Sequence, residues 1–258
     1  MNIGVIGAGA IANFLLEATK QETNNHLHIK SIYVSDYKKY KSLEEKYHVT
    51  LYTDLDAFLQ SNIDIVVEAA NIDAVKKLIP QILPMKDVVL ICIGALADLS
   101  FYEHIKALAN QYQRAIHLPS GAIGGLDLLQ NAHAQGEVSD VTLITRKSAH
   151  SLIDQTIERE TVVFSGSAKD AIQQFPKNIN VSIILSMAGV GLEKTNVKII
   201  ADPEMTKNRH EIKISGTFGE ATFAVTNEPL VMNPKTSYLA ALSVLGTLKR
   251  LPHTIKVG

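Results

Sequence analysis

A glycine-rich turn near the N-terminus is the clearest chemical signal in the sequence. The segment Gly7-Ala8-Gly9-Ala10-Ile11-Ala12 follows an apolar run, Asn2–Ile6, and matches the dinucleotide-binding pattern G-x-G-x-x-G/A. Gly7 permits a tight turn, and Gly9 lets the backbone approach a pyrophosphate. The helix that follows begins with free N–H groups, which attract the anion. The pattern therefore predicts a nucleotide cofactor held at Gly7, Gly9, Ala10 and Ile11.

An acidic residue, Asp36, follows the second apolar run of the chain. At this place in a dinucleotide-binding fold, a carboxylate accepts hydrogen bonds from both hydroxyls of the adenosine ribose and repels a 2′-phosphate. Asp36 therefore favours NAD as the cofactor. Lys38 and Lys39 follow it and could accommodate the phosphate, so NADP stays possible. The alternative role of Asp36 is to cap the N-terminus of a helix.

Nine histidines are candidates for acid–base chemistry. Histidine suits this work because its unperturbed pKa is about 6.5. His210 differs from the others because it begins an expected strand and shares one face of it with Ile212 and Ile214. That face should pack inward or against a cleft. The pattern alone leaves both a structural and a catalytic histidine open.

The elements of the first half alternate short apolar runs with segments of helical period. This alternation is typical of a parallel sheet covered by helices on both faces. Strands are expected at Asn2–Ile6, Leu27–Val34, Ile63–Val67, Val88–Ile93 and Ala115–Leu118. The pattern predicts an α/β fold with a Rossmann-type doubly wound parallel sheet, forming a dinucleotide-binding domain over residues 1–119.

After Pro119 the expected strands become polar and alternating. They lie at Val141–Thr145, Thr161–Phe164, Val197–Ala201, His210–Ser215 and Ala221–Val225, the last two joined by a hairpin at Gly216–Gly219. Helices near 168–175 and 181–190 should pack on one side of an antiparallel sheet. Residues 120–233 are thus expected to form a second, α+β domain for substrate and subunit contacts. A final helix, Pro234 to Leu251 within 234–258, is expected to return to the first domain.

Charge and composition exclude several classes of partner. Of 258 residues, 46% are hydrophobic and 20% are charged, as in a globular protein. The formal net charge is −1 and no long basic run occurs, so neither nucleic acid nor an anionic membrane is expected as a partner. The sequence has no run of about 18 apolar residues and no basic segment before its first apolar stretch. We therefore expect a cytoplasmic protein.

Metal and thiol chemistry are not expected either. The single cysteine, Cys92, lies in the apolar run Val88 to Gly94 and should be buried and inert. The sequence contains no HExxH motif and no cluster of His, Cys, Asp and Glu at the spacing of metal ligands.

The segment Ser120-Gly121-Ala122-Ile123-Gly124-Gly125-Leu126-Asp127 resembles the SGAIGGLD signature of the L-aspartate dehydrogenase family. Members of that family oxidise aspartate to iminoaspartate with a nicotinamide cofactor. Four more segments are similar to the family's motifs, in its order: Pro176–Val181, Ala201–Pro203, Asn208–His210 and Asn233–Ser237. The resemblance extends from the glycine turn to the final helix.

The resemblance implies roles for individual residues. The dinucleotide would contact Ala122 and Asn180, and His210 would be the catalytic residue. The product would hydrolyse to oxaloacetate and ammonia or supply NAD biosynthesis. A homo-oligomer is also expected.

A dicarboxylic amino acid as substrate needs cations and hydroxyls around it. Residues of these types are more often surface charges or helix caps than substrate contacts. Three of the candidates, Lys235, Thr236 and Ser237, are expected at a helix start. The candidates are Ser120, Arg146, Lys147, Arg209, Lys235, Thr236 and Ser237.

Two other functions stay open at this point. One is a two-domain NAD(P)-dependent reductase acting on a semialdehyde, a dihydrodipicolinate or a sugar. The other is a non-catalytic protein that senses dinucleotides with a degenerate second domain. The combination of SGAIGGLD with His210 and Asn180 favours the aspartate dehydrogenase reading over both.

Overall fold

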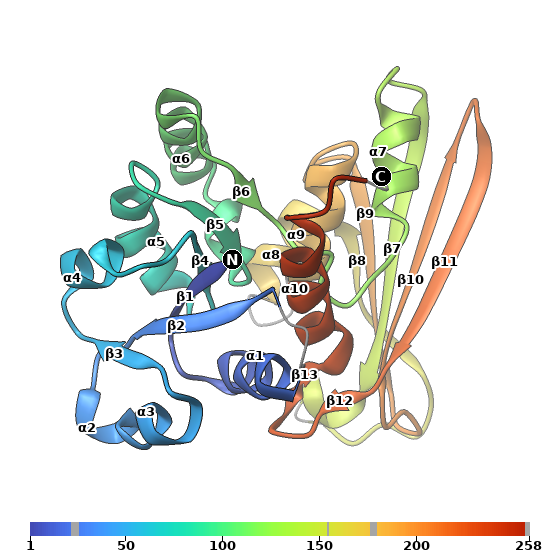
Figure 1. Ribbon diagram of the computed structural model, residues 1–258. Helices are drawn as coiled ribbons and strands as arrows, with labels where there is room; N and C mark the ends of the chain where they lie inside the picture. Colours follow the sequence, from blue (N-terminus) through green and yellow to red (C-terminus); the bar gives the residue numbers. More distant parts are fainter. Residues whose placement is uncertain (22–25, 154, 176–179, 256–258) are drawn as a thin grey trace. The chain divides into compact units, whose positions relative to one another are not determined.

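The computed structural model describes residues 1–21, 26–153, 155–175 and 180–255, with the side chain of Lys235 left out. The chain divides into two units (Figure 1). The first comprises Met1–Pro119 together with the C-terminal segment from Ala241, and the second comprises Ser120–Ala240.

The first unit is built on a six-stranded sheet in the order β3-β2-β1-β4-β5-β6. All neighbouring strands are parallel. The strands are β1 Asn2–Ile6, β2 His28–Tyr33, β3 Thr50–Tyr52, β4 Ile65–Glu68, β5 Asp87–Leu90 and β6 Ile116–His117. This order is that of a doubly wound sheet, with the switch between β1 and β4.

Helices cover both faces of this sheet. The helices are α1 Ala10–Gln21, α2 Tyr37–Tyr40, α3 Ser42–Tyr47, α4 Leu55–Gln60, α5 Ile72–Ile82, α6 Leu99–Tyr112 and α10 Tyr238–Arg250. On one face, Val5 shares a hydrophobic cluster with Leu15 of α1 and Val244 of α10 (Figure 1). On the other, a Cβ added to Gly4 would lie 2.6 Å from the Phe58 ring of α4. The predicted Rossmann-type fold is confirmed.

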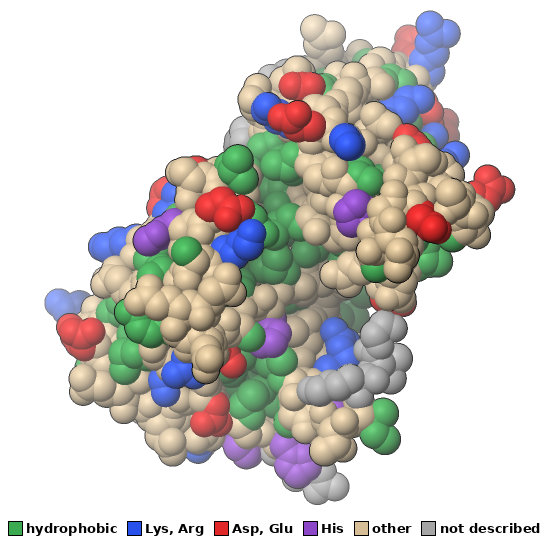
Figure 2. Space-filling view, turned by 90° about the horizontal axis from the view of Figure 1, so that it is seen from above, with side chains coloured by type: hydrophobic (Ala, Val, Ile, Leu, Met, Phe, Trp, Pro, Cys, Tyr) green, Lys and Arg blue, Asp and Glu red, His purple; other side chains and the backbone are tan. Residues whose placement is uncertain are grey.

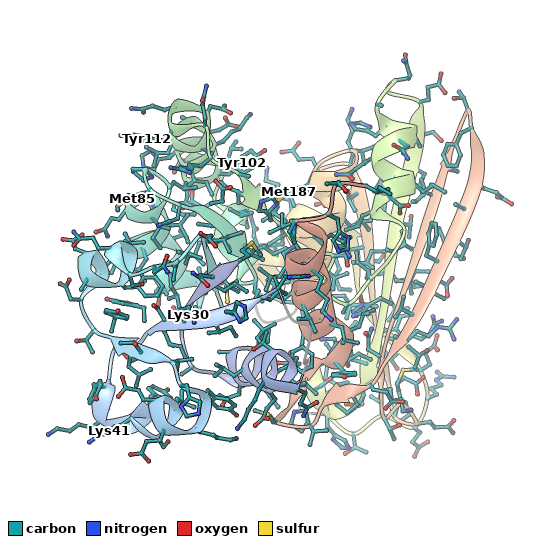
Figure 3. The ribbon with its side chains drawn as sticks, viewed as in Figure 1. Lys30, Lys41, Met85, Tyr102, Tyr112 and Met187 are labelled. Carbon is teal, nitrogen blue, oxygen red and sulfur yellow. The ribbon has the colours of Figure 1, made fainter. Side chains whose placement is uncertain are left out.

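Helix α6 illustrates how the apolar period sets the faces of these helices. Ile105 and Ala109, four residues apart, are buried. Tyr102 and Tyr112 project from other sides of the helix (Figure 3). The expected strand Val88–Ile93 ends earlier, at Leu90, and Ile93–Ala97 forms a 3₁₀-helix, η1.

The second unit contains a five-stranded sheet in the order β11-β10-β7-β9-β8. Helices α7, α8 and α9 pack against it. Its elements are β7 Val138–Ser148, β8 Thr161–Ser167, β9 Thr195–Asp202, β10 Asn208–Gly216, β11 Gly219–Asn227, α7 Leu126–His133, α8 Ala168–Gln174, α9 Asn180–Ala188 and the 3₁₀-helix η2 Ala149–Ser151. This is the predicted α+β fold.

The expectation of a fully antiparallel sheet in this unit is wrong. Strands β7 and β9, at its centre, are parallel. Parallel neighbours need a long crossover between them. The chain provides one, because β8, α8 and α9 all lie between β7 and β9 in the sequence.

The start of the final helix also differs from the expectation. Residues Asn233–Ser237 form strand β13, which pairs with β12 Pro229–Leu230 in a two-stranded sheet. Helix α10 therefore begins at Tyr238 and not at Pro234. Proline is tolerated in β13 because an edge strand can lack one donor.

The surface carries charges of both signs. On the face in Figure 2, lysine and arginine side chains are interspersed with aspartate and glutamate, without an extended patch of either sign. Within the described part of the chain, no helix is long and apolar enough to cross a membrane.

Candidate active site

The glycine turn closes directly onto the backbone of a neighbouring strand end. Gly7 has φ +92°, and a Cβ there would lie 2.8 Å from the carbonyl oxygen of Ala69. Its N–H donates to the Tyr33 carbonyl oxygen at 2.9 Å. A side chain at Gly7 would thus strain the backbone and collide with it. The turn has the shape that a close approach of pyrophosphate requires.

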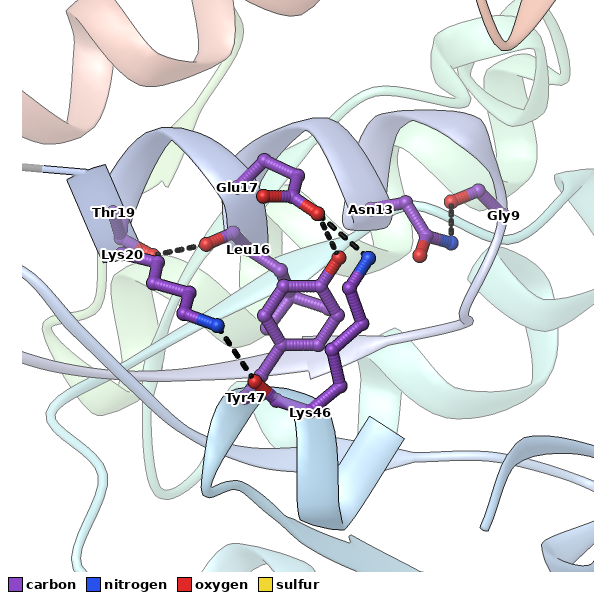
Figure 4. Close-up of polar contacts among 8 residues, drawn as sticks. All are labelled: Gly9, Asn13, Leu16, Glu17, Thr19, Lys20, Lys46 and Tyr47. Atoms are coloured by element: carbon purple, nitrogen blue, oxygen red, sulfur yellow. Dashed lines mark hydrogen bonds and ion pairs between the residues drawn. The ribbon is translucent and has the colours of Figure 1, made fainter. Parts of the chain in front are cut away.

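Asn13, in the first turns of α1, holds the glycine turn through hydrogen bonds from its side chain. Its Nδ2 donates to the carbonyl oxygens of Ala8 at 3.0 Å and Gly9 at 2.9 Å (Figure 4). Asn13 was not among the residues predicted from the sequence. The available signal was a polar amide four residues after Gly9, where a side chain reaches back to the preceding turn.

Helix α1 is in turn fastened to α3. Glu17 accepts from the Lys46 ammonium at 2.7 Å and from the Tyr47 hydroxyl at 2.5 Å (Figure 4). These hydrogen bonds keep the pKa of Glu17 below its ordinary value, mainly through Lys46. The network orients the helix whose N-terminus faces the glycine turn.

A cavity of about 460 Å³ opens beside the turn and is called the glycine-turn cavity below. Its walls come from four neighbouring segments at the carboxyl ends of parallel strands, where α/β folds bind their ligands. They are the turn itself (Ile6, Gly7, Ala8, Gly9), the end of β2 and α2 (Tyr33, Val34, Ser35, Tyr40), the loop after β4 (Ala69, Ala70, Asn71) and α5 (Asp73, Ala74, Lys77, Leu78). Ala10 and Ile11 form the first turn of α1. The cavity and the turn fit a dinucleotide.

Asp36 caps a helix in this structure. Its Oδ1 accepts from the Lys39 N–H at 3.1 Å, at the start of α2. Among the described residues no other hydrogen bond to Asp36 is found, so Oδ2 stays available to a ribose hydroxyl. Its neighbour Ser35 lines the glycine-turn cavity. The cap and the predicted ribose contact are therefore compatible.

In the second unit, His210 and Thr145 lie opposite each other on neighbouring strands, β10 and β7. The Thr145 hydroxyl and His210 Nδ1 are 3.0 Å apart. His210 is 5% exposed and Thr145 6%. This hydrogen bond restrains the imidazole ring through Nδ1, and among the described residues no hydrogen bond to Nε2 is found. The sequence does not indicate Thr145, because only the strand register shows that it faces His210.

Lys147 shares this face of β7 with Thr145, two residues away. It is half-buried, and burial lowers the pKa of its ammonium group. Burial, and after it the charge of Lys147, lower the pKa of His210 to about 3. The near-neutral pKa expected of the catalytic base is thus not found in the free protein, because the sequence could not show how deeply His210 is buried.

Arg146 and Arg209 lie on the opposite face of the same sheet. They alternate with Lys147 and His210 along their strands. Arg146 pairs with Glu160 at 3.1 Å, and Arg209 with Glu211 at 3.4 Å. Both were substrate candidates, but the structure does not bring them together with His210.

The segment with the SGAIGGLD signature is held by β11, the neighbour of β10. Asn227 is buried and donates from Nδ2 to the Ala122 carbonyl oxygen at 3.1 Å. Gly125 has φ +76°, and a Cβ there would lie 2.5 Å from the Phe223 ring. The close packing explains a glycine at this position and fixes Ala122 relative to β11.

The other predicted residues lie at the ends of elements. Asn180 begins α9, and Ser120 begins the second unit. The Thr236 hydroxyl accepts from Asn233 Nδ2 at 3.0 Å within β13, and not at a helix start as expected. The side chain of Lys235 lies outside the described residues. In the described ranges, no group of three or more His, Cys, Asp or Glu side chains is arranged to hold a metal ion.

Comparison with known proteins relates both units to dehydrogenases. Residues 7–119 match the family described as "Homoserine dehydrogenase, NAD binding domain", and residues 127–251 match "Aspartate dehydrogenase, C-terminal". The chain is 38% identical to L-aspartate dehydrogenase of Methanosarcina barkeri, over 100% of this chain and 99% of the relative.

Solved structures agree. The crystal structure of aspartate dehydrogenase from Thermotoga maritima matches with a TM-score of 0.81 and 32% identity, over 100% of this chain and 99% of that chain. Scyllo-inositol dehydrogenase from Lactobacillus casei, solved with NAD(H) and scyllo-inositol, matches with a TM-score of 0.54 and 14% identity, over 86% of this chain and 75% of that one. The second match reflects the fold alone.

The fold, the glycine turn and its cavity define a dehydrogenase with a nicotinamide dinucleotide as cofactor. Its substrate class is that of the amino-acid dehydrogenases. The chain belongs to the L-aspartate dehydrogenase family, and the predicted resemblance is confirmed.

Proposed function

We propose that this protein catalyses the NAD(P)-dependent oxidation of L-aspartate to iminoaspartate. The observation that carries the proposal is the position of a buried imidazole, His210, and a half-buried ammonium, Lys147, on the same face of the neighbouring strands β10 and β7. This face belongs to the unit that matches aspartate dehydrogenases. A base for the ammonium group and a cation for a carboxylate are what an amino-acid substrate requires.

The residues of the chain divide the work between them. The bound dinucleotide supplies the hydride acceptor. Neutral His210 takes a proton from the substrate ammonium, since the amine must be neutral before the Cα–H bond breaks, and later orients the water that attacks the imine. Lys147 holds a substrate carboxylate. The negative carboxylate offsets the positive charge of Lys147, so the pKa of His210 rises once substrate is bound.

The remaining roles are assigned within this proposal. Gly7, Gly9, Ala10, Ile11, Asp36, Ala122 and Asn180 hold the dinucleotide. Ser120, Lys235 and Thr236 join Lys147 as substrate contacts. Residues 1–119 serve as the dinucleotide-binding domain, while 120–233 supply the catalytic groups. The product then hydrolyses to oxaloacetate and ammonia or supplies NAD biosynthesis. A homo-oligomer and a cytoplasmic location stay predictions.

Purified protein should reduce NAD or NADP when L-aspartate is added, followed by the absorbance of the reduced nicotinamide. Oxaloacetate with ammonia should drive the reverse reaction. The control is a panel of other substrates that contains scyllo-inositol, a semialdehyde and other amino acids. Turnover of one of these without any turnover of aspartate would contradict the proposal.

We further propose NAD as the preferred cofactor, with Asp36 as the residue that discriminates. Asp36→Ser should lower the ratio of NAD to NADP efficiency about 10-fold, because a carboxylate beside a 2′-phosphate costs at least about 1.4 kcal/mol. Serine keeps the ability to cap α2. The measurement is kcat/KM for both cofactors at saturating aspartate.

A matched control is Asp54→Ser in the same unit. Asp54 caps α4 by accepting from the Ala57 N–H at 2.8 Å. Neither of its chain neighbours lines the glycine-turn cavity, whereas Ser35, the neighbour of Asp36, does. Its replacement should leave the cofactor ratio unchanged. If Asp36→Ser also leaves the ratio of NAD to NADP efficiency unchanged, Asp36 acts only as a helix cap.

A further inference from the structure

Glu68, the last residue of β4, is a carboxylate with 0% exposure in the core of the first unit. Every other residue of this strand is apolar. Burying a charge is costly unless hydrogen bonds replace the lost water. An apolar residue at this position would cost less free energy to bury, so a role beyond packing would explain the carboxylate.

The carboxylate bridges the loops that follow two neighbouring strands. Oε1 accepts from the Ala70 N–H at 2.7 Å, after β4, and Oε2 accepts from the Cys92 N–H at 3.0 Å, after β5. The Ile91 N–H and the Cys92 thiol also donate to it. Burial raises the pKa of Glu68 and these hydrogen bonds oppose the rise. Burial and the nearby carboxylate raise the pKa of the Cys92 thiol, in agreement with an inert cysteine.

The first of these loops forms a wall of the glycine-turn cavity. Ala69, Ala70 and Asn71 all line it. Gly7 lies against the same backbone, because a Cβ on Gly7 would be 3.1 Å from Ala70 Cα. A shift of Ala70 therefore moves the surface against which the glycine turn rests.

The same loop also sets the start of α5. Asn71 caps this helix, its Oδ1 accepting from the Ala74 N–H at 2.9 Å. Ala74 and Lys77 of α5 line the cavity as well. The single bond from Glu68 to Ala70 thus supports two of the four segments that surround the cavity.

We propose that Glu68 is a positioning residue for the dinucleotide: its buried carboxylate holds the loop after β4 against the glycine turn. The proposal deepens the proposed function, since it concerns the cofactor site of that reaction. Glu68 does not touch the cofactor. It acts through the Ala69–Asn71 backbone.

The test is Glu68→Gln, with NADH binding measured by fluorescence in the absence of aspartate. Glutamine has the size of glutamate but only one acceptor oxygen. Its NH₂ group would therefore face one of the two backbone N–H groups, of Ala70 or Cys92, which would lose its acceptor. The dissociation constant of NADH should rise about 10- to 100-fold. In turnover, KM for NAD should rise while kcat at saturating NAD stays within about 3-fold.

Two controls separate positioning from general stability. Ser31→Ala removes a partly buried hydrogen bond to Ser61, 2.8 Å long, in the same unit but outside the cavity wall. It should lower the melting temperature without changing the affinity for NADH. Cys92→Ala removes the thiol but keeps the backbone donor, and its affinity should stay within about 2-fold of the wild type.

If Glu68→Gln does not fold, Glu68→Asp serves instead, because it keeps the charge and shortens the reach by one methylene. A folded variant at position 68 that binds NADH normally would overturn the proposal, as would a wild type that does not bind NADH. The binding assay uses no aspartate. A wild type that binds NADH but leaves aspartate unchanged would therefore contradict the proposed function and leave this test valid.

Discussion

His210→Ala is expected to lower turnover with L-aspartate by about 10²- to 10⁴-fold, the usual range for loss of a general base. The imidazole is held by Thr145, 3.0 Å from Nδ1, and burial keeps it neutral in the free protein. A substrate carboxylate on Lys147 is expected to raise its pKa so that it can accept a proton. NADH affinity should change little, because His210 is not one of the residues assigned to the dinucleotide and the glycine-turn cavity lies wholly in the other unit. Steady-state kinetics and NADH titration measure the two effects separately.

His210→Asn provides a second variant that keeps a hydrogen-bonding partner for Thr145 but has no basic nitrogen. It should lose activity to a similar degree. His133→Ala is the matched control, since His133 is exposed on α7 of the same unit. Near-normal kcat in folded His210→Asn would show that His210 is structural.

The first unit was largely predictable from its periodicity. Strands such as Asn2–Ile6 are continuous apolar runs because both faces of a parallel sheet are covered. The three-residue strand β3 and the short helices α3 and α4 were not predicted. The short helix α2 was anticipated only as the helix that Asp36 would cap. Segments of this length contain too few turns or alternations to establish a period.

The second unit shows what periodicity omits. Alternation indicates which residues share a face, as for Thr145 and Lys147, but not which strand lies beside them. The parallel pairing of β7 and β9 and the contact of Thr145 with His210 depend on register between segments far apart in sequence. For the same reason Glu68 was overlooked, because its partners Ala70 and Cys92 belong to two different loops.

Lys147→Met should raise KM for L-aspartate about 10- to 100-fold, because a hydrogen bond to a charged partner contributes about 1.5–3 kcal/mol. Methionine has a similar length but carries no charge. The variant should also change the pH dependence. Lys147 lowers the pKa of His210, so its removal should raise that pKa from about 3. Since the neutral imidazole is the active form, the acidic limb of kcat/KM should move to higher pH.

Lys213→Met is the matched control for this variant. Lys213 lies on β10, three residues after His210 and on the opposite face, where its ammonium is 3.4 Å from Glu211. Its replacement removes the same charge but should change neither KM nor the pH profile. If Lys147→Met keeps the KM of the wild type and an unmoved acidic limb, Lys147 does not bind the substrate carboxylate. A higher KM with an unmoved acidic limb would support the contact between Lys147 and the substrate carboxylate. It would contradict the electrostatic effect of Lys147 on the pKa of His210.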